Sequence, residues 1–160
     1  MNLYLLRHAK SSWESYEDDH ERVLSERGRK DACTLGEYLH KNDINFENTL
    51  CSSSHRTRET ISIINTVSPH SIDQINYLND LYHASSNKIK EIIQNHTNKS
   101  LLIVGHNPGI SDLISDLMKS NFIDYPTCVF AQFNLISQDV ANAEVQMVIR
   151  PKNKKIINLL

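Results

Sequence analysis

Leu-Tyr-Leu-Leu-Arg-His-Ala-Lys-Ser-Ser-Trp, residues 3–13, is the stretch from which the fold is best interpreted. Its first four residues are apolar, which is typical of a strand buried on both faces. Arg7 and His8 follow at once, so both are predicted at the carboxyl end of that strand. In open α/β sheets this edge is where ligands bind. Taken alone, an Arg-His pair is better explained as a solvated loop, but two similar junctions follow further along the chain.

The composition is that of an ordinary globular protein. The chain has 160 residues, 39% hydrophobic and 22% charged, which is enough to bury a core without metal or disulfide support. We therefore expect one domain over residues 1–160. The net charge of -2 gives no reason to expect a nucleic-acid partner. No run of residues could span a bilayer and the start of the sequence lacks signal-peptide features, so we expect no membrane partner and a cytoplasmic location.

Cysteine use agrees with this location. Cys33, Cys51 and Cys128 are far apart and odd in number. Such a set argues against a disulfide framework and favours a reducing cytosol. Zinc-type spacing is also absent from the sequence.

Predicted strands and helices alternate along most of the chain. Strands are predicted at 3–6, 48–52 and 100–104, the last being the strongest buried-strand signal. Helices are predicted from Ser25, as N-cap, to about His40, from near His55 onward, and around 89–93. A further helix follows Asn107, a candidate cap, and Pro108, which suits the first helical position. This order predicts an α/β protein, a three-layer α/β/α sandwich with a mostly parallel central sheet.

The remaining segments are less regular. Residues 14–22 are acidic without apolar periodicity and are expected to form an exposed excursion. Residues 68–87 are expected to be irregular with at most one short strand. Alternating apolar residues at 129–135 and 145–149 predict two strands joined by a polar turn around 137–142. Residues 152–155 begin a basic stretch that we expect to be a solvated tail.

Three strand-to-loop junctions carry the candidate chemistry: Arg7 with His8, Arg56 with Arg58, and His106. If the sheet is parallel at these strands, the side chains converge on one edge. Two histidines and three arginines without a carboxylate set make a poor metal site, so no metal or other cofactor is expected. They make a good phosphoryl site, where the arginines bind oxygens and a helix start adds N–H groups. A neutral histidine could then attack phosphorus.

These residues carry a resemblance to a known family. Leu-Arg-His-Ala at 6–9, Ser-Ser-Ser-His-Arg-Thr-Arg-Glu-Thr at 52–60 and Gly-His at 105–106 resemble the motifs of the histidine phosphatase superfamily, which shares its fold with phosphoglycerate mutases. Arg-His-Ala-Lys-Ser-Ser-Trp and the small size resemble the SixA-type phosphohistidine phosphatases. The resemblance implies that His8 becomes phosphorylated, that Arg7, Arg56 and His106 hold the phosphate, and that the mixed sheet has one antiparallel strand.

The activity implied by the resemblance is a metal-independent phosphatase that acts on phosphohistidine in proteins. The partner would then be a phosphohistidine-bearing signalling or phosphotransfer protein. A small-molecule phosphomonoesterase and a phosphoglycerate mutase-like enzyme stay open, although a mutase needs loops for which 160 residues leave little room. A phosphate-binding module without turnover is a further alternative. A cysteine phosphatase fails on spacing, because only four residues separate Cys51 from Arg56 and that chemistry needs five.

The supporting residues are less sharply defined. Asp80 is the nearest match to the acid that larger family members use. The interpretation of Asp80 as an ordinary turn residue is equally good. The resemblance to SixA-type enzymes also leaves open a site without a strong acid, since a phosphoramidate nitrogen can be protonated before cleavage. Trp13 either lines the pocket or covers the core. The candidates for substrate binding are Lys10, Ser11, Ser12, Arg58, His83 and Asn107.

Overall fold

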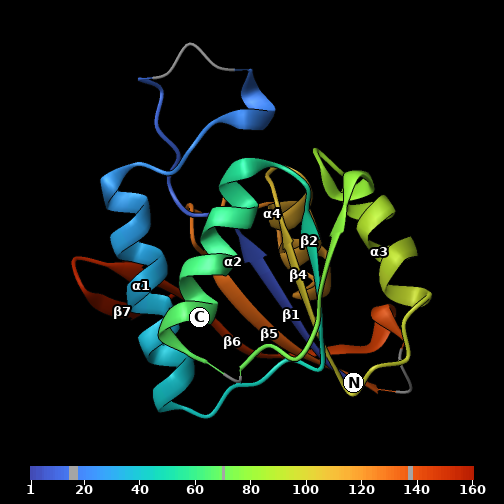
Figure 1. The fold of residues 1–160 in the computed structure, drawn as a ribbon. Coiled ribbons are helices and arrows are strands. Elements are labelled where there is room, and N and C mark those ends of the chain that lie inside the picture. The colour runs from blue at the N-terminus through green and yellow to red at the C-terminus, as the bar shows by residue number, and fades with distance from the viewer. Residues whose placement is uncertain (15–17, 70, 137–138) are drawn as a thin grey trace.

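A seven-stranded sheet forms the centre of the molecule (Figure 1). The computed structural model describes residues 1–14, 18–69, 71–136 and 139–160. The strand order is β3-β2-β4-β1-β5-β6-β7. The strands are β1 (Asn2–Arg7), β2 (Asn48–Ser52), β3 (Ile75–Leu78), β4 (Ser100–Gly105), β5 (Phe130–Leu135), β6 (Ala143–Lys152) and β7 (Lys155–Asn158).

Helices cover both faces of this sheet. The α-helices are α1 (Glu26–Lys41), α2 (His55–Val67), α3 (Ser86–Gln94) and α4 (Gly109–Leu117), with short 3-10 turns η1 (Asp19–Glu21), η2 (Asn79–Leu81) and η4 (Val140–Asn142). The helices α1 and α2 lie on one face, and α3 and α4 lie on the other (Figure 1). The predicted three-layer sandwich is confirmed. None of the helices in the described ranges is long and apolar enough to cross a membrane.

The sheet is mixed, as expected. The strands β3, β2, β4 and β1 pair in parallel. β5 runs antiparallel to β1, and β6 and β7 continue with antiparallel pairing. β5 is therefore the expected antiparallel strand, and β7 adds a second strand in the same reversed direction.

The expectation of a solvated basic tail is wrong. Lys155–Asn158 forms β7, which pairs with β6. Asn153 and Lys154 join the two strands with φ values of 52° and 60°. Positive φ at both central residues is typical of a tight hairpin turn. The short, polar sequence carries too little apolar alternation to reveal this strand.

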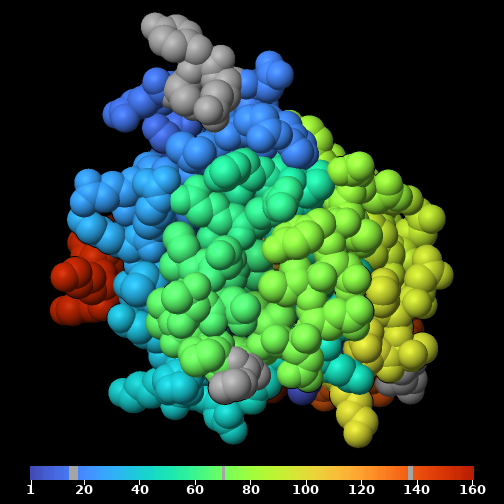
Figure 2. Space-filling view, viewed as in Figure 1, coloured from blue at the N-terminus to red at the C-terminus, as the bar shows by residue number. Residues whose placement is uncertain are grey.

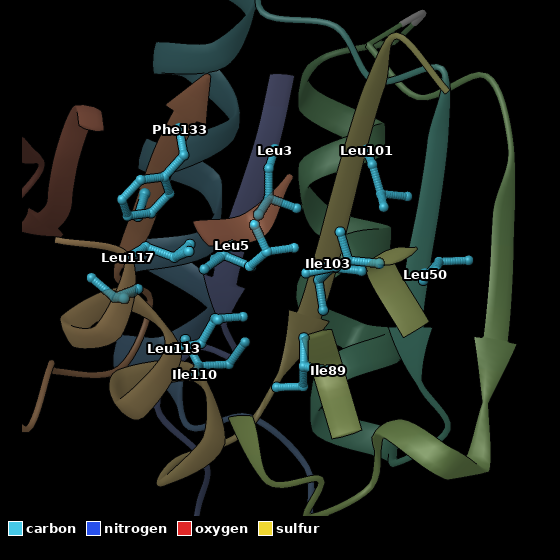
Figure 3. Close-up of a cluster of buried hydrophobic side chains, with 14 of the residues drawn as sticks. Leu3, Leu5, Leu50, Ile89, Leu101, Ile103, Ile110, Leu113, Leu117 and Phe133 are labelled. Carbon is cyan, nitrogen blue, oxygen red and sulfur yellow. The ribbon is translucent and has the colours of Figure 1, made fainter. Parts of the chain in front are cut away.

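β1 lies in the middle of the sheet, and its side chains pack into two hydrophobic cores, one on each face. Leu3 and Leu5 point into the core under α3 and α4, and Figure 3 draws both in this core together with Leu113 and Leu117 of α4. Leu6 points the other way, into the core under α1 and α2, together with Tyr4. All four are at least 95% buried, with exposures of 0–5%. Full burial on both faces explains the unbroken apolar run in the sequence.

The first turn of α1 is fastened to the loop that follows β1. Ser25 caps the helix as expected, because its hydroxyl accepts a hydrogen bond from Gly28 N at 3.1 Å. Ser25 N also donates to the carbonyl oxygen of Lys10 at 2.8 Å. A Cβ atom on Gly28 would lie 2.1 Å from the same oxygen. Glycine is therefore needed at position 28 for the helix to approach the loop this closely.

The start of α4 differs from the expectation. The helix begins at Gly109 with Pro108 in the N-cap position, and Asn107 does not cap it. Instead the Asn107 amide donates to Asp124 Oδ1 at 2.7 Å and to Tyr125 O at 3.1 Å. The acidic excursion and the 137–142 turn are only partly described, since residues 15–17, 137 and 138 lie outside the described ranges.

Candidate active site

A pocket of about 190 Å³ lies where three strands end. Arg7, the last residue of β1, is in register with Gly105 of β4. β2 pairs with the other side of β4, so the start of α2 reaches the same edge. Parallel pairing thus brings His8, Arg56 and His106 together, and all of them line this strand-end pocket.

His8 is held in one orientation and one protonation form. Its Nδ1 lies 2.8 Å from the carbonyl oxygen of Ala9. Since a carbonyl oxygen only accepts hydrogen bonds, Nδ1 carries the proton and Nε2 keeps its lone pair. Arg56 Nε donates toward that lone pair over 3.3 Å. Burial, aided by the charges of Arg56, Arg7 and Arg22, lowers the pKa of His8 to about 3 against a weaker opposing effect of Ala9. His8 is therefore neutral at pH 7.

The backbone of His8 is anchored on both sides. His8 N donates to Gly105 O at 3.1 Å, and His8 O accepts from Cys128 N at 3.0 Å. The next residue, Ala9, donates through its N–H to Thr60 Oγ1 on α2 at 3.1 Å. The nucleophile candidate is thus fixed to β4, to the segment before β5 and to α2.

His106 contributes a second buried imidazole. Its ring centroid lies 5.1 Å from that of His8. Its Nε2 lies 2.8 Å from Ser52 Oγ, and a hydroxyl that donates there places the ring proton on Nδ1. Burial lowers the pKa of His106, and the neighbouring His8 and Arg56 lower it further. His106 is therefore also a neutral group at pH 7.

Two buried nitrogen atoms in the pocket have no hydrogen-bond partner among the described residues. They are His106 Nδ1 and Arg7 Nε. Arg7 uses another atom, Nη1, to donate to Tyr125 O at 2.5 Å. Buried donors nearly always have acceptors in folded proteins. An oxyanion bound beside His8 offers such acceptors, and its charge suits the arginines.

One carboxylate, that of Asp19, also belongs to the pocket. Arg56 Nη2 and His83 Nε2 donate to its Oδ2 at 3.0 and 3.1 Å, and Tyr82 OH donates there at 2.6 Å. Arg22 Nη1 donates to Oδ1 at 3.0 Å. Although burial raises the pKa of Asp19, these four hydrogen bonds hold it well below its usual range. Asp19 is therefore ionised at neutral pH.

The expected substrate-binding residues divide into two groups. Lys10, Ser11, His83 and Asn107 line the strand-end pocket. Ser12, Arg58 and Asp80 are not among the residues that line it. The Ser12 hydroxyl accepts from Glu14 N at 3.1 Å, and the Arg58 guanidinium lies 4.9 Å from the centre of the Tyr77 ring.

Asp80 lies outside the pocket as well. It is exposed, and Lys88 Nζ contacts its carboxylate at 3.2 Å. The structure therefore does not support the hypothesis that Asp80 is the general acid, and its position within the 3-10 turn η2 fits the interpretation as an ordinary turn residue.

Sequence reasoning missed three residues that line the pocket, namely Asp19, Arg22 and Thr127. Asp19 and Arg22 belong to the stretch expected to be an exposed excursion, yet Arg22 is only 9% exposed. In Figure 2 the blue segment that contains η1 lies across the top of the molecule against the green of α2. Trp13 lines the mouth of the pocket rather than the core, and the Arg22 guanidinium lies 3.4 Å from its ring centre. No periodicity in this stretch could have indicated these roles.

The exclusion of cysteine chemistry agrees with the structure. Burial raises the pKa of Cys51 to about 12, so the thiolate is not formed at neutral pH. Its Sγ donates to Ser52 O at 3.3 Å and does not line the pocket. Across residues 1–14, 18–69, 71–136 and 139–160, no group of three or more His, Cys, Asp or Glu side chains is placed to hold a metal ion.

Comparison with known proteins gives one family match. Residues 3–84 match the model of the histidine phosphatase superfamily (branch 1). An uncharacterized protein of Mycobacterium leprae is 38% identical over 113 residues, which is 66% of this chain. The chain spans 66% of the length of that relative.

Solved structures with the same fold cover nearly the whole chain. The protein histidine phosphatase SixA, complexed with tungstate, superposes with a TM-score of 0.84 over 97% of this chain and 100% of its own, at 19% identity. An Agrobacterium tumefaciens protein assigned to phosphohistidine phosphatase SixA superposes with a TM-score of 0.78 over 94% of this chain and 97% of its own, at 25% identity.

Proposed function

Because this chain belongs to the histidine phosphatase superfamily, we propose that it is a phosphatase that passes a phosphoryl group through His8 to water. One observation carries the proposal. His8 is neutral, its Nδ1 proton is bound by Ala9 O, and its Nε2 lone pair faces a cluster of cationic donors. This is the arrangement of a histidine that attacks an electrophile through Nε2.

The reaction follows from these positions in two steps. In the first, His8 Nε2 forms a bond to phosphorus while the bond to the leaving group breaks. In the second, water attacks the same phosphorus, the P–N bond breaks, and phosphate leaves. Throughout, Ala9 O stabilises the Nδ1 proton of the phosphorylated imidazole. Arg7, Arg56 and His106 surround the equatorial oxygens, where cationic and N–H donors lower the barrier.

Phosphohistidine in a protein is the substrate class that fits best. A pocket of about 190 Å³ holds a phosphoryl group and little else, so the rest of the substrate stays outside. The leaving nitrogen of phosphohistidine can be protonated before the P–N bond breaks, and Asp80 is not in the pocket to serve as an acid. SixA proteins, to which the fold is similar, carry the name phosphohistidine phosphatase. The partner is then a phosphohistidine-bearing signalling or phosphotransfer protein, bound by a single domain over residues 1–160.

The test is to trap the phosphorylated enzyme. The protein is mixed with a ³²P-phosphohistidine protein, quenched in alkali on the millisecond scale, and analysed by gel and peptide mapping. Label is expected on the peptide that contains His8. The label should be stable to alkali and labile to acid, as a phosphoramidate is.

His8→Asn is the key variant and His55→Asn is its matched control. Asn keeps a group near the Nδ1 position but cannot attack phosphorus. His55 is the first residue of α2, next to Arg56, yet it does not line the pocket. His8→Asn is expected to lose label and at least about 10³-fold of kcat, whereas His55→Asn should keep both. Turnover by His8→Asn near the rate of the parent protein would disprove the mechanism.

A further inference from the structure

Phosphate esters of alcohols need a proton donor in the site, whereas the leaving nitrogen of phosphohistidine can be protonated before cleavage. An alkoxide is a poor leaving group, so cleavage of its P–O bond needs a proton donor in the transition state. The structure leaves few candidates for this proton. Arginines do not release one at neutral pH. His8 is the proposed nucleophile, and His106 is a buried neutral imidazole that contacts Ser52.

The carboxylate in the pocket is not a proton donor either. Hydrogen bonds from Tyr82, His83, Arg56 and Arg22 hold the pKa of Asp19 well below its usual range against the effect of burial. Asp19 is therefore an acceptor at neutral pH. Its Oδ2 lies 3.1 Å from His83 Nε2. Because an ionised carboxylate only accepts, His83 Nε2 carries a proton in this contact.

His83 is placed where a leaving group would pass. It lines the strand-end pocket with a side chain that is 52% exposed, at the boundary between the buried nucleophile and solvent. Its ring centroid lies 5.2 Å from that of His106, which in turn lies 5.1 Å from that of His8. His83 therefore lies beside His106 on the exposed side of the pocket that His8 and His106 also line.

The backbone around His83 supports this placement. His83 has a φ of 53°, in the left-handed region that few non-glycine residues adopt. Residues held in such conformations concentrate at functional sites. The next carbonyl, Ala84 O, would lie 2.0 Å from a Cβ on Gly109, so α4 begins directly against this segment. The position of His83 is thus set by packing against the helix that follows His106.

We propose that His83, oriented by the Asp19 carboxylate, donates and accepts the proton when this site cleaves alkyl phosphate monoesters. The proposal rests on the proposed function, since it uses the same phosphorylated His8. Its new element is the assignment to His83 of the proton that a phosphate ester of an alcohol requires. The His83 ring donates to Asp19, and the rings of Tyr82 and His106 lie beside it with centroids 4.3 and 5.2 Å away.

The protons balance over the two steps. As His8 Nε2 bonds to phosphorus, the P–O bond breaks and the leaving oxygen takes a proton from the His83 imidazolium, which gives a neutral alcohol. In the second step water attacks the phosphorus, and the now neutral His83 takes one of its protons. The P–N bond then breaks, and His8 returns to its neutral form with the proton still on Nδ1. Histidine suits both directions because its charge changes near neutral pH.

The experiment compares substrates that differ in their need for an acid. Values of kcat/KM are measured for 4-nitrophenyl phosphate, whose leaving group is stable as an anion, and for glycerol 2-phosphate, whose leaving group is an alkoxide. The variants are His83→Gln and, as a matched control outside the pocket, His55→Gln. His83→Gln is expected to lower kcat/KM for glycerol 2-phosphate by about 10²-fold. The loss in kcat/KM for 4-nitrophenyl phosphate is expected to be smaller by a factor of about ten or more.

Each contrary outcome is informative. Equal losses for both esters, or no loss for glycerol 2-phosphate, would overturn the role of His83. So would a parent protein that forms the His8 phosphoenzyme from 4-nitrophenyl phosphate but does not cleave glycerol 2-phosphate. Circular dichroism and the rate of phosphoenzyme formation from 4-nitrophenyl phosphate show whether His83→Gln is folded. If His8→Asn keeps activity on both esters, the proposed function fails instead.

Discussion

Each of the three nitrogen atoms of the Arg56 guanidinium donates a hydrogen bond in the pocket. Its Nε donates to His8 Nε2 at 3.3 Å, Nη1 donates to Asp19 O at 2.5 Å, and Nη2 donates to Asp19 Oδ2 at 3.0 Å. The side chain is 3% exposed. A planar fork in this setting cannot be replaced by an ammonium group, which offers a single point of charge.

Arg56→Lys is therefore expected to lose transition-state stabilisation. The predicted loss in kcat/KM corresponds to about 1–3 kcal/mol, the scale of a hydrogen bond to a charged group. Arg58→Lys, two positions along the same helix, is the matched control because Arg58 lies over Tyr77 and not in the pocket. Steady-state kinetics on one substrate measures both. Similar losses in the two variants would show that Arg56 has no special part in the site.

At this scale the sequence predicts the site only in part. His8, Arg56 and His106 follow strands, so their convergence could be deduced from the parallel sheet. Asp19 could not, because it acquires its role only when the segment before Leu24 folds back over the pocket. Its neighbours in the sequence carry no pattern that specifies this path.

The first turn of α1 supports the loop that carries the nucleophile. Gly28→Ala would place a Cβ atom 2.1 Å from Lys10 O, a backbone atom that cannot rotate away. Alanine favours a helix by about 1 kcal/mol over glycine, and this clash is expected to reverse the sign. We predict a loss of about 1–3 kcal/mol in the free energy of unfolding, the cost of overpacking.

Urea denaturation tests the Gly28→Ala prediction, and phosphatase kinetics adds a second readout. A loop displaced at Lys10 should also lower kcat/KM, since Lys10 lines the pocket. Glu37→Ala, on the exposed face of the same helix, controls for the general effect of alanine. A Gly28→Ala protein as stable and active as the parent would show that the helix can move away from Lys10 without cost.

Among the elements, length and burial decide what could be predicted. β1 and β4 are buried on both faces, so their apolar runs are visible in the sequence. β7 has four residues and lies at the edge of the sheet, where a strand needs few apolar side chains. Ser25 could be identified as a cap from residue type alone, whereas Asn107 could not be assigned because its partners, Asp124 and Tyr125, are far along the chain.

At the scale of the whole molecule, the buried histidines make stability depend on pH. The pKa of folded His8 is lowered to about 3, whereas an unfolded histidine titrates near ~6.5. Above that pH the two states bind equal numbers of protons at this residue. Below it the unfolded chain binds one more, so stability falls as the pH drops toward 3. His106 acts in the same direction.

Between pH 7 and pH 5 this linkage is expected to cost about 2 kcal/mol for His8. His8→Asn should therefore show a shallower decline in the free energy of unfolding over that interval, measured by urea denaturation at several pH values. His55→Asn, whose side chain is half exposed, should decline as the parent protein does. Parallel curves for the parent and His8→Asn would mean that His8 is not held neutral by burial.

The proposed reaction uses only protein groups, and chelation tests this directly. Activity on 4-nitrophenyl phosphate is expected to stay within about twofold after dialysis against EDTA, because arginines supply the positive charge that a metal would otherwise supply. The measurement is a rate before dialysis, after it, and after return of zinc or manganese. A large loss that one of these ions restores would assign the phosphate to a metal centre instead.

The position of β1 between β4 and β5 also decides when the protein can become active during its synthesis. β1, which ends at Arg7 next to His8, is made well before its two neighbours, which begin at Ser100 and Phe130. Pairing over such distances is slow, and apolar strands stay exposed until it occurs. A ribosome-bound chain stalled with residues 1–90 outside the tunnel should thus bind chaperones and form no phosphoenzyme, whereas one with residues 1–160 outside should form it. His8 would then acquire its function only after the much later strands β4 and β5 have been made.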